Sequence, residues 1–212
     1  MNRNIMTRQY RGMQSKRAGE HFENLITASC IWYREHGLAC IDKTPEQMKP
    51  LRPPNMSGQF LACYTKAAQP DYQGTLEGGR SVVFEAKHTD DDRIKYDRLT
   101  GDQIEDLEMH HRLGAVAFVL VSFGLQGYYR IPWEVWRDMK QIYGRKYITR
   151  EEAERYSVPF VSGVIRIMEY VYKAEEILNW DADHNNVCVA CGGLSVGGTK
   201  MCIECRQKRG LL

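Results

Sequence analysis

Asp71, Glu85 and Lys87 are the residues whose types and spacing best suit chemistry in this chain. Hydrolysis of a phosphodiester needs a divalent cation, which offsets the charge building up on the phosphoryl oxygens, and a positioned water. Mg²⁺ is usually held by one or two carboxylates together with waters. A neighbouring lysine can orient the water or stabilise the developing charge. The three residues therefore predict a metal-dependent nuclease site, although a solvated strand end with a surface ion pair would contain the same residues.

The strand that carries Glu85 and Lys87 decides whether these groups can meet. Side chains alternate along a strand, so Glu85 and Lys87 share one face, and a charged pair that ends an apolar strand suits a site at a sheet edge. A hairpin that turns about Gly78 places Asp71 opposite Glu85 on that face. A turn between Gly78 and Gly79 places Asp71 opposite Ala86, so its side chain faces away from Glu85. The sequence permits either register.

Four cysteines near the C-terminus form a second constellation. They lie in two Cys-x-x-Cys pairs separated by ten residues: Cys188, Cys191, Cys202 and Cys205. Two such pairs can complete a tetrahedral Zn²⁺ site, and a segment of this size needs a metal or disulfides to hold it together. Structural zinc is the prediction for residues 184–209, with redox cysteines or disulfides as the alternative. The other three cysteines, Cys30, Cys40 and Cys63, are expected to be small buried hydrophobic residues.

The elements that must position these groups follow from the hydrophobic pattern. Helices are expected over 18–36, from a capping box at Thr100 to about Leu113, after Pro132, and over 167–179. Strands are expected over 38–42, 60–65, 71–76, 80–88, 115–123 and 128–131, of which 115–123 is apolar throughout and therefore central. Prolines exclude a regular helix or a central strand over 44–59, which indicates a projecting excursion. The order predicts an α/β domain with a mixed sheet.

Charge is distributed unevenly although the net charge is only +2. Basic residues concentrate in an N-terminal arm, 1–18, and after residue 200, where they suit phosphate contacts or simply form solvated ends. No apolar run approaches the length of a membrane span, and the first residues lack the apolar core of a secretory signal. A cytoplasmic protein with no membrane partner is expected.

Several motifs in order resemble one family. Asp71-Tyr72-Gln73-Gly74, then Phe84-Glu85-Ala86-Lys87, then Asp102-Gln103-Ile104-Glu105 resemble the RecU-type Holliday junction resolvases of the PD-(D/E)xK nuclease superfamily. The likeness covers roughly residues 19–172. It implies a restriction-endonuclease-like mixed sheet flanked by helices over 19–180. A C-terminal zinc ribbon departs from the usual family pattern.

The resemblance also implies roles for individual residues. Asp71 and Glu85 would bind catalytic Mg²⁺ (or Mn²⁺), and Lys87 would orient water or stabilise charge. Glu23 would be a further metal or water ligand, with Glu20 one helical turn away as a competitor. Gln103 would lie near the site, although a helix cap explains it equally well.

The family's DNA-binding features can be placed in the same way. Residues 44–66 would form a stalk that enters the centre of a four-way junction. DNA contacts are expected from Lys49, Arg52, Lys66, Arg145 and Lys146. The family is homodimeric, and two-fold symmetry would allow two symmetric cuts.

The leading prediction is a structure-selective endonuclease that resolves four-way DNA junctions during recombination and repair, encoded by a bacterium or a phage. A nuclease of the same fold acting on duplex or flapped DNA is one alternative. A non-catalytic DNA-binding accessory protein is another, although it would have no need for the two carboxylates and the lysine together. The zinc ribbon would add a contact to DNA or to a protein.

Overall fold

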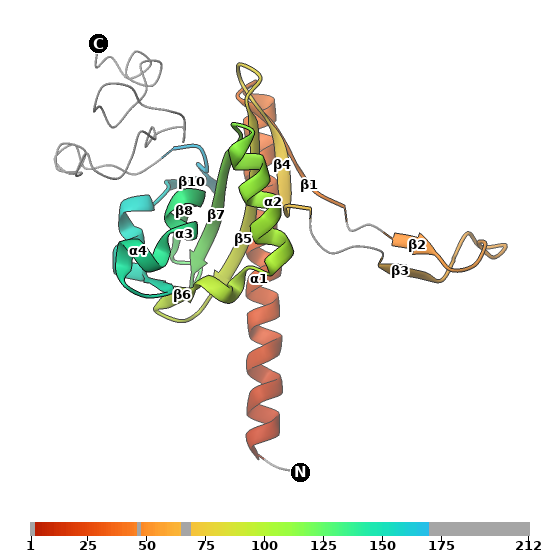
Figure 1. Ribbon diagram of the computed structural model, residues 1–212. Helices are drawn as coiled ribbons and strands as arrows, with labels where there is room; N and C mark the ends of the chain where they lie inside the picture. Colours follow the sequence, from red (N-terminus) through yellow and green to blue (C-terminus); the bar gives the residue numbers. More distant parts are fainter. Residues whose placement is uncertain (1–2, 46–47, 65–68, 170–212) are drawn as a thin grey trace.

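The protein is built around one five-stranded mixed sheet (Figure 1), and the computed structural model describes residues 3–45, 48–64 and 69–169. Its strand order is β1-β4-β5-β7-β8, in which β5 and β7 are parallel and the other neighbours antiparallel. The strands are β1 (Ala39–Lys43), β4 (Tyr72–Leu76), β5 (Ser81–Thr89), β7 (Val116–Phe123) and β8 (Gly127–Pro132). The mixed α/β sheet expected from the sequence is confirmed.

Helices cover both faces of this sheet. Helix α1 (Arg3–Glu35) packs behind it against β1 and β5, and Phe22 of α1 stacks on Tyr128 of β8. Helices α2 (Gly101–Arg112) and α3 (Trp133–Arg137) pack against β7 from the front (Figure 1). Trp133 and Trp136 of α3 are fully buried.

Helix α1 begins fifteen residues earlier than the expected start at residue 18. The pattern of apolar residues ends near residue 22, and the side chains of 12–17 are exposed, so no packed face marks this part of the helix. The segment 3–17 has no proline and consists largely of residues with adequate helix propensity, which allows the helix to continue without such a face. Figure 1 shows this end of α1 projecting beyond the sheet.

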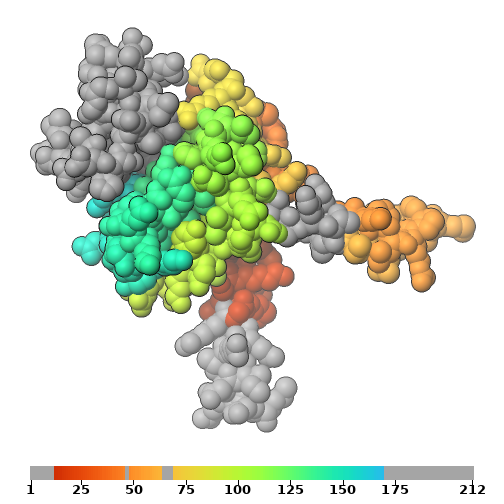
Figure 2. All heavy atoms as spheres, viewed as in Figure 1, coloured from red at the N-terminus to blue at the C-terminus, as the bar shows by residue number. Residues whose placement is uncertain are grey.

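The proline-containing segment forms a narrow ribbon that projects from the body (Figures 1 and 2). Strands β2 (Met48–Pro50) and β3 (Ala62–Tyr64) pair antiparallel within it, and β3 is shorter than the expected strand 60–65. At its base, the amide of Thr44 donates to the carbonyl of Asp71, at 2.9 Å. The ribbon therefore leaves the body beside the first residue of the predicted site.

Short elements complete the described chain: β6 (Arg93–Lys95), η1 (Tyr96–Arg98), α4 (Met139–Tyr143), β9 (Tyr147–Thr149), α5 (Arg150–Ala153), η2 (Glu154–Tyr156), β10 (Phe160–Val161) and β11 (Val164–Ile165). The expected helix over 167–179 does not begin at Ile167, because residues 167–169 form a turn. The rest of that helix and the predicted zinc ribbon lie outside the described residues. Within the described ranges, no helix has the length and apolar character needed to cross a membrane.

The prediction for the three isolated cysteines is right for one of them. Cys30 of α1 is buried in the core. Cys40 is exposed because it lies on the outward face of the edge strand β1, between the buried Ala39 and Ile41. Cys63 is exposed because it lies on the projecting ribbon. Apolar neighbours in sequence therefore did not predict burial at these two positions.

Candidate active site

The hairpin register brings the two predicted carboxylates together. Tyr72 pairs with Phe84 and Thr75 with Ser81, so the turn is centred on Gly78 and Asp71 precedes β4 opposite Glu85. Gly78 has φ of +87°, a left-handed backbone conformation that glycine adopts without strain. Of the two registers that the sequence permits, the protein adopts the one that a shared site requires.

Backbone amides hold the two carboxylates in place. The amide of Asp71 donates to Oε1 of Glu85, at 3.2 Å, and the amide of Ala86 donates to Oδ2 of Asp71, at 3.0 Å. The sequence offers no signal for these contacts, because every residue except proline has an amide and only the register selects these two. Each carboxylate is thus held by a backbone amide from the segment that carries the other carboxylate.

Lys87 lies between the carboxylates. Its Nζ donates to Oε2 of Glu85, at 2.8 Å, and lies 3.6 Å from Oδ2 of Asp71. The lysine side chain is 14% exposed, whereas that of Asp71 is 34% exposed. The side of the cluster that solvent or a substrate can reach is therefore formed mainly by Asp71.

Gln103 both caps a helix and reaches the cluster, so the two interpretations left open by the sequence are compatible. Its backbone amide and side-chain oxygen complete a capping box with Thr100 at the start of α2. Its Nε2 donates to Oε2 of Glu85, at 2.5 Å. The capping box holds the side chain of Gln103 in place, and its side-chain amide in turn orients the carboxylate of Glu85.

Glu85 is an acid in an environment that disfavours its charge. Its side chain is fully buried. Its pKa is raised to about 7: burial is the largest cause, the negative charge of Asp71 adds to it, and Lys87 offsets part of the increase. Although β5 is the middle strand of the sheet, β4 stops pairing with it before Glu85, so the cluster lies where one side of β5 becomes free.

The donor set of this cluster fits a magnesium ion. Mg²⁺ prefers oxygen ligands and commonly takes only one or two protein carboxylates, with waters and substrate phosphates completing its shell. Asp71 and Glu85 supply two such groups. A cation between them would offset both the burial of the Glu85 charge and its repulsion by Asp71, which together raise the pKa of Glu85. Groups of three or more acidic, histidine or cysteine side chains suited to a metal do not occur among the described residues.

Glu23 lies outside this hydrogen-bonded cluster. Its carboxylate pairs with Nζ of Lys43 on β1, at 2.7 Å. Lys43 is the cross-strand partner of Tyr72, on the side of the sheet that α1 covers. Glu23 is near enough to Tyr72 for its charge to help raise the pKa of that phenol, after burial, which is the larger cause. It thus approaches the start of β4 from the α1 side.

The residues expected to bind DNA differ in their surroundings. Lys49 and Arg52 are exposed on the projecting ribbon, and Lys66 lies outside the described residues. Arg145 is engaged within the protein, because its Nη2 lies 2.7 Å from both carboxylate oxygens of Glu152. Lys146 is exposed, and its Nζ lies 5.1 Å from the ring centre of Tyr96.

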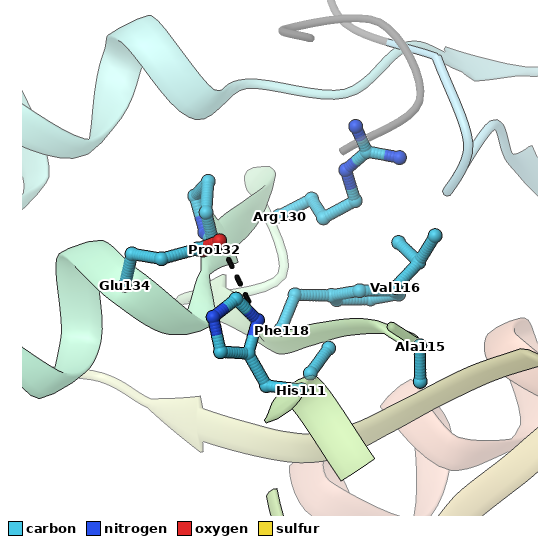
Figure 3. Close-up of a pocket in the computed structure, with 8 residues that line it drawn as sticks. His111, Ala115, Val116, Phe118, Arg130, Pro132 and Glu134 are labelled. Atoms are coloured by element: carbon cyan, nitrogen blue, oxygen red, sulfur yellow. Dashed lines mark ion pairs between the residues drawn. The ribbon is translucent and has the colours of Figure 1, made fainter. Parts of the chain in front are cut away.

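A separate hollow lies at the start of β7 (Figure 3). It is lined by residues of α2, β7 and β8 and the start of α3, and His111 Nδ1 lies there 3.5 Å from Oε1 of Glu134. Its β7 residues begin at Val116, which pairs with Val82, three positions before Glu85. The carboxylate cluster does not line this hollow, whose buried Arg130 packs over Phe118.

Taken together, a mixed sheet with helices on both faces and an Asp–Glu-x-Lys cluster on the strand β5 defines an α/β protein of the nuclease class. The chain matches the family model RecU, Recombination protein U, over residues 17–175. It belongs to this family.

Curated relatives agree with this assignment. The Holliday junction resolvase RecU of Geobacillus sp. (strain WCH70) is 29% identical over 172 residues, which cover 75% of this chain and 83% of the relative. The protein of the same name from Streptococcus pneumoniae serotype 19F (strain G54) is 29% identical over 167 residues, covering 76% and 84%. Hjc, a Holliday junction resolvase from Archaeoglobus fulgidus, is a structural match with 16% identity and a TM-score of 0.39, covering 64% of this chain and 91% of Hjc.

Proposed function

We propose that this chain is a Mg²⁺-dependent endonuclease that resolves Holliday junctions in DNA recombination. The observation that carries the proposal is the cluster of Asp71, Glu85, Lys87 and Gln103, held together by the hairpin register and the capping box. Membership of the RecU family and the names of the relatives support the choice of substrate. A nuclease uses all four side chains, whereas a non-catalytic DNA-binding protein has no need for them together.

Asp71 and Glu85 would hold the metal ion. When bound, Mg²⁺ would offset the negative charge on the phosphoryl oxygens and provide a template for the attacking water. The amides of Asp71 and Ala86 keep both carboxylates fixed, which lowers the cost of organising the site when DNA arrives. Gln103 keeps Glu85 oriented through its amide.

Lys87 would act on the substrate rather than on the metal. Its ammonium already lies beside both carboxylates and is held between them, so it is positioned to orient water or to stabilise negative charge on the phosphate. Glu23 would contribute through a water molecule from the α1 side, where it is now paired with Lys43.

The projecting ribbon would serve as the stalk that enters the junction. It leaves the body next to Asp71, and its length and exposed Lys49 and Arg52 suit an element surrounded by phosphates. Lys66 and Lys146 would add phosphate contacts. Arg145 would support DNA binding in one of two ways: its ion pair with Glu152 would hold this region rigid, or its guanidinium would leave Glu152 and bind a phosphate.

Two further features belong to the proposal. A homodimer would place two such sites on opposite strands of a two-fold symmetric junction. A Zn²⁺ ion bound by Cys188, Cys191, Cys202 and Cys205 would stabilise residues 184–209, which would contact DNA or a protein. Zinc content of the full chain, compared between the native protein and Cys188→Ser, tests the second feature: about one zinc per chain, absent from the variant, is the expected result.

The substrate is tested with labelled DNA of three shapes. The native protein is incubated with a synthetic four-way junction, a matched duplex and a flapped duplex, in Mg²⁺ and in EDTA. Paired cuts in opposite strands of the junction, dependent on Mg²⁺ and absent from the duplex, are expected. Equal cutting of all three would retain the nuclease and contradict the junction selectivity, and cutting in EDTA would contradict the metal requirement.

A further inference from the structure

A second, smaller ribbon flanks the carboxylate cluster. Strands β6 and β9 pair antiparallel, with Ile94 opposite Ile148 and Lys95 opposite Tyr147. The two isoleucines are buried, at 1% and 0% exposure, and anchor the ribbon to the body. Alternation along the strands then turns the other face outward, where Arg93 and Lys95 are exposed and Tyr147 is half-buried. Strand β6 of this β6–β9 ribbon lies at the lower left of the body, near the end of β5 (Figure 1).

Cations gather around one aromatic ring on the outward face of the β6–β9 ribbon. The guanidinium carbon of Arg93 lies 5.3 Å from the ring centre of Tyr147, and that of Arg145 lies 4.6 Å from it. Lys95 is the direct cross-strand neighbour of Tyr147. Cations placed over an aromatic face are held in position without being neutralised.

The positive charge of this face is only partly compensated within the protein. Arg145 is neutralised by two close contacts with Glu152. Arg93 has only a 3.4 Å ion pair with Asp92, whose side chain is 82% exposed, so this pair contributes little and can be exchanged for another anion. Among the described residues, no ion pair involves Lys95. Two cations are thus available to an external anion.

The β6–β9 ribbon is tied to β5, which carries Glu85 and Lys87, and to α2, which carries Gln103. It follows β5 after three residues and leads through η1 to Thr100, the cap of α2. The guanidinium of Arg98 donates to the carbonyl of His88, at 3.1 Å, and the amide of Tyr96 donates to the carbonyl of Lys146, at 3.0 Å. The ribbon is therefore fixed relative to Glu85 and Gln103.

The separation between ribbon and cluster suits a single DNA duplex. Arg93 follows Lys87 by six positions, and a chain of that length spans at most about 22 Å. One turn of B-form DNA measures about 34 Å. A duplex with a phosphate at the cluster would therefore have further phosphates within reach of Arg93 and Lys95.

We infer that Arg93 and Lys95, on the outward face of the β6–β9 ribbon, bind the sugar–phosphate backbone of the duplex arm whose strand is cut at the carboxylate cluster. The inference rests on the proposed nuclease function and adds a contact that positions the arm. Because these residues meet phosphates and not bases, the contact is independent of sequence and is made with a plain duplex as well as with a junction.

The test measures binding separately from cutting. Lys95→Ala and the double variant Arg93→Ala/Lys95→Ala are compared with Arg112→Ala, which removes an exposed cation at the far end of α2. Dissociation constants for a labelled four-way junction and a duplex are measured in EDTA at several salt concentrations, and single-turnover cleavage of the junction is measured in Mg²⁺. Circular dichroism and thermal unfolding check that every variant is folded.

The double variant is expected to bind both DNAs about ten-fold more weakly. The negative slope of log affinity against log salt is expected to become shallower by roughly 0.9 for each phosphate that the variant no longer neutralises. Arg112→Ala should bind like the native protein. Saturating concentrations of the double variant should still cut the junction, because the cluster is intact. If the native protein binds and cuts the junction and the double variant matches Arg112→Ala, the ribbon inference is overturned and the proposed function stands. If the native protein binds neither DNA, both are overturned.

Discussion

Glu85 combines two opposing demands at the residue scale. It is buried to the same degree as the aliphatic core, yet it must be ionised to bind a divalent cation. Lys87 and the amide of Gln103 offset part of the cost of that charge, while Asp71 adds to it. A carboxylate in such surroundings binds protons readily when no metal is present.

This property predicts how stability depends on pH. The pKa of Glu85 rises from its ordinary value of 4.5 to about 7 in the folded protein. Folding is therefore favoured by protonation: the contribution is fully present below about pH 4.5 and is lost as pH rises through about 7. In EDTA, Glu85→Gln should remove this decline, so that the variant becomes more stable relative to the native protein between pH 5 and 8.

Urea unfolding at several pH values measures this difference, and Glu105→Gln, which changes an exposed glutamate of α2, serves as the control. Parallel curves for the native protein and Glu85→Gln would contradict the raised pKa.

The two roles of Gln103 can be separated by substitution. Gln103→Ala removes the side-chain half of the capping box and the contact with Glu85, so it should lower the free energy of unfolding by about 1 kcal/mol and also slow cleavage. Gln103→Glu can keep the capping box but places a third carboxylate against Glu85, so it should slow cleavage while α2 stays stable. Cleavage by Gln103→Glu at the native rate would show that this residue is only a cap. Thermal unfolding and single-turnover kinetics supply the two readouts.

At the scale of elements, the site depends on close pairing of β1 and β4. A Cβ atom at Gly74 would overlap the carbonyl oxygen of Cys40 and would lie 2.6 Å from Cα of Ile41. Backbone atoms cannot move away as a flexible side chain can. Gly74 thus allows β1 to approach β4, and β4 carries Asp71 at its start.

Gly74→Ala is therefore expected to destabilise the protein by about 2–3 kcal/mol and to reduce cleavage as β4 shifts. Gly19→Ala is the matched control, since nothing lies within 4 Å of a Cβ at this helical position and the change should be neutral or stabilising. Denaturant unfolding of the two variants provides the comparison. A Gly74→Ala protein as stable as the native one would contradict the close packing of β1 on β4.

The elements differ in how far the sequence could predict them. The capping box at Thr100 and the apolar strand β7 depend on local chemistry, and both are confirmed. The hairpin register was open because two adjacent glycines tolerate either turn, and only packing of Tyr72 on Phe84 and the neighbouring strands selects one. The predicted start of α1 was wrong: the helix begins at Arg3, and the side chains of 12–17 are exposed, so they leave no amphipathic pattern in the sequence.

The site was predictable in its residue types more than in its surroundings. Asp71, Glu85 and Lys87 were selected by their chemistry and spacing, and the structure brings them within hydrogen-bonding distance or close to it. The complete burial of Glu85 was not foreseen, because it depends on the long-range placement of α2 and β7 beside β5. Glu23 was assigned by resemblance, and its partner in the structure is Lys43.

At the scale of the whole molecule, metal binding should be coupled to folding. A ligand that binds only the folded state stabilises it by RT ln(1 + [L]/Kd), about 2.7 kcal/mol at a concentration of one hundred times Kd. Mg²⁺ should therefore raise the melting temperature of the native protein at pH 8, and the increase should disappear in Asp71→Asn, which keeps the shape of the side chain but removes its charge. An equal increase in both proteins would place the bound metal elsewhere.

The central claim is that the cluster of Asp71, Glu85, Lys87 and Gln103 cuts the DNA that the rest of the molecule binds. The most direct test compares native protein and Asp71→Asn on one labelled four-way junction, with affinity measured in EDTA and single-turnover cleavage measured in Mg²⁺. Loss of a group that stabilises the transition state typically costs a factor of about 10² to 10³ in rate, so cleavage should fall by at least that factor while affinity stays within about three-fold. Cleavage by Asp71→Asn at more than about a tenth of the native rate would contradict the assignment of this cluster as the active site.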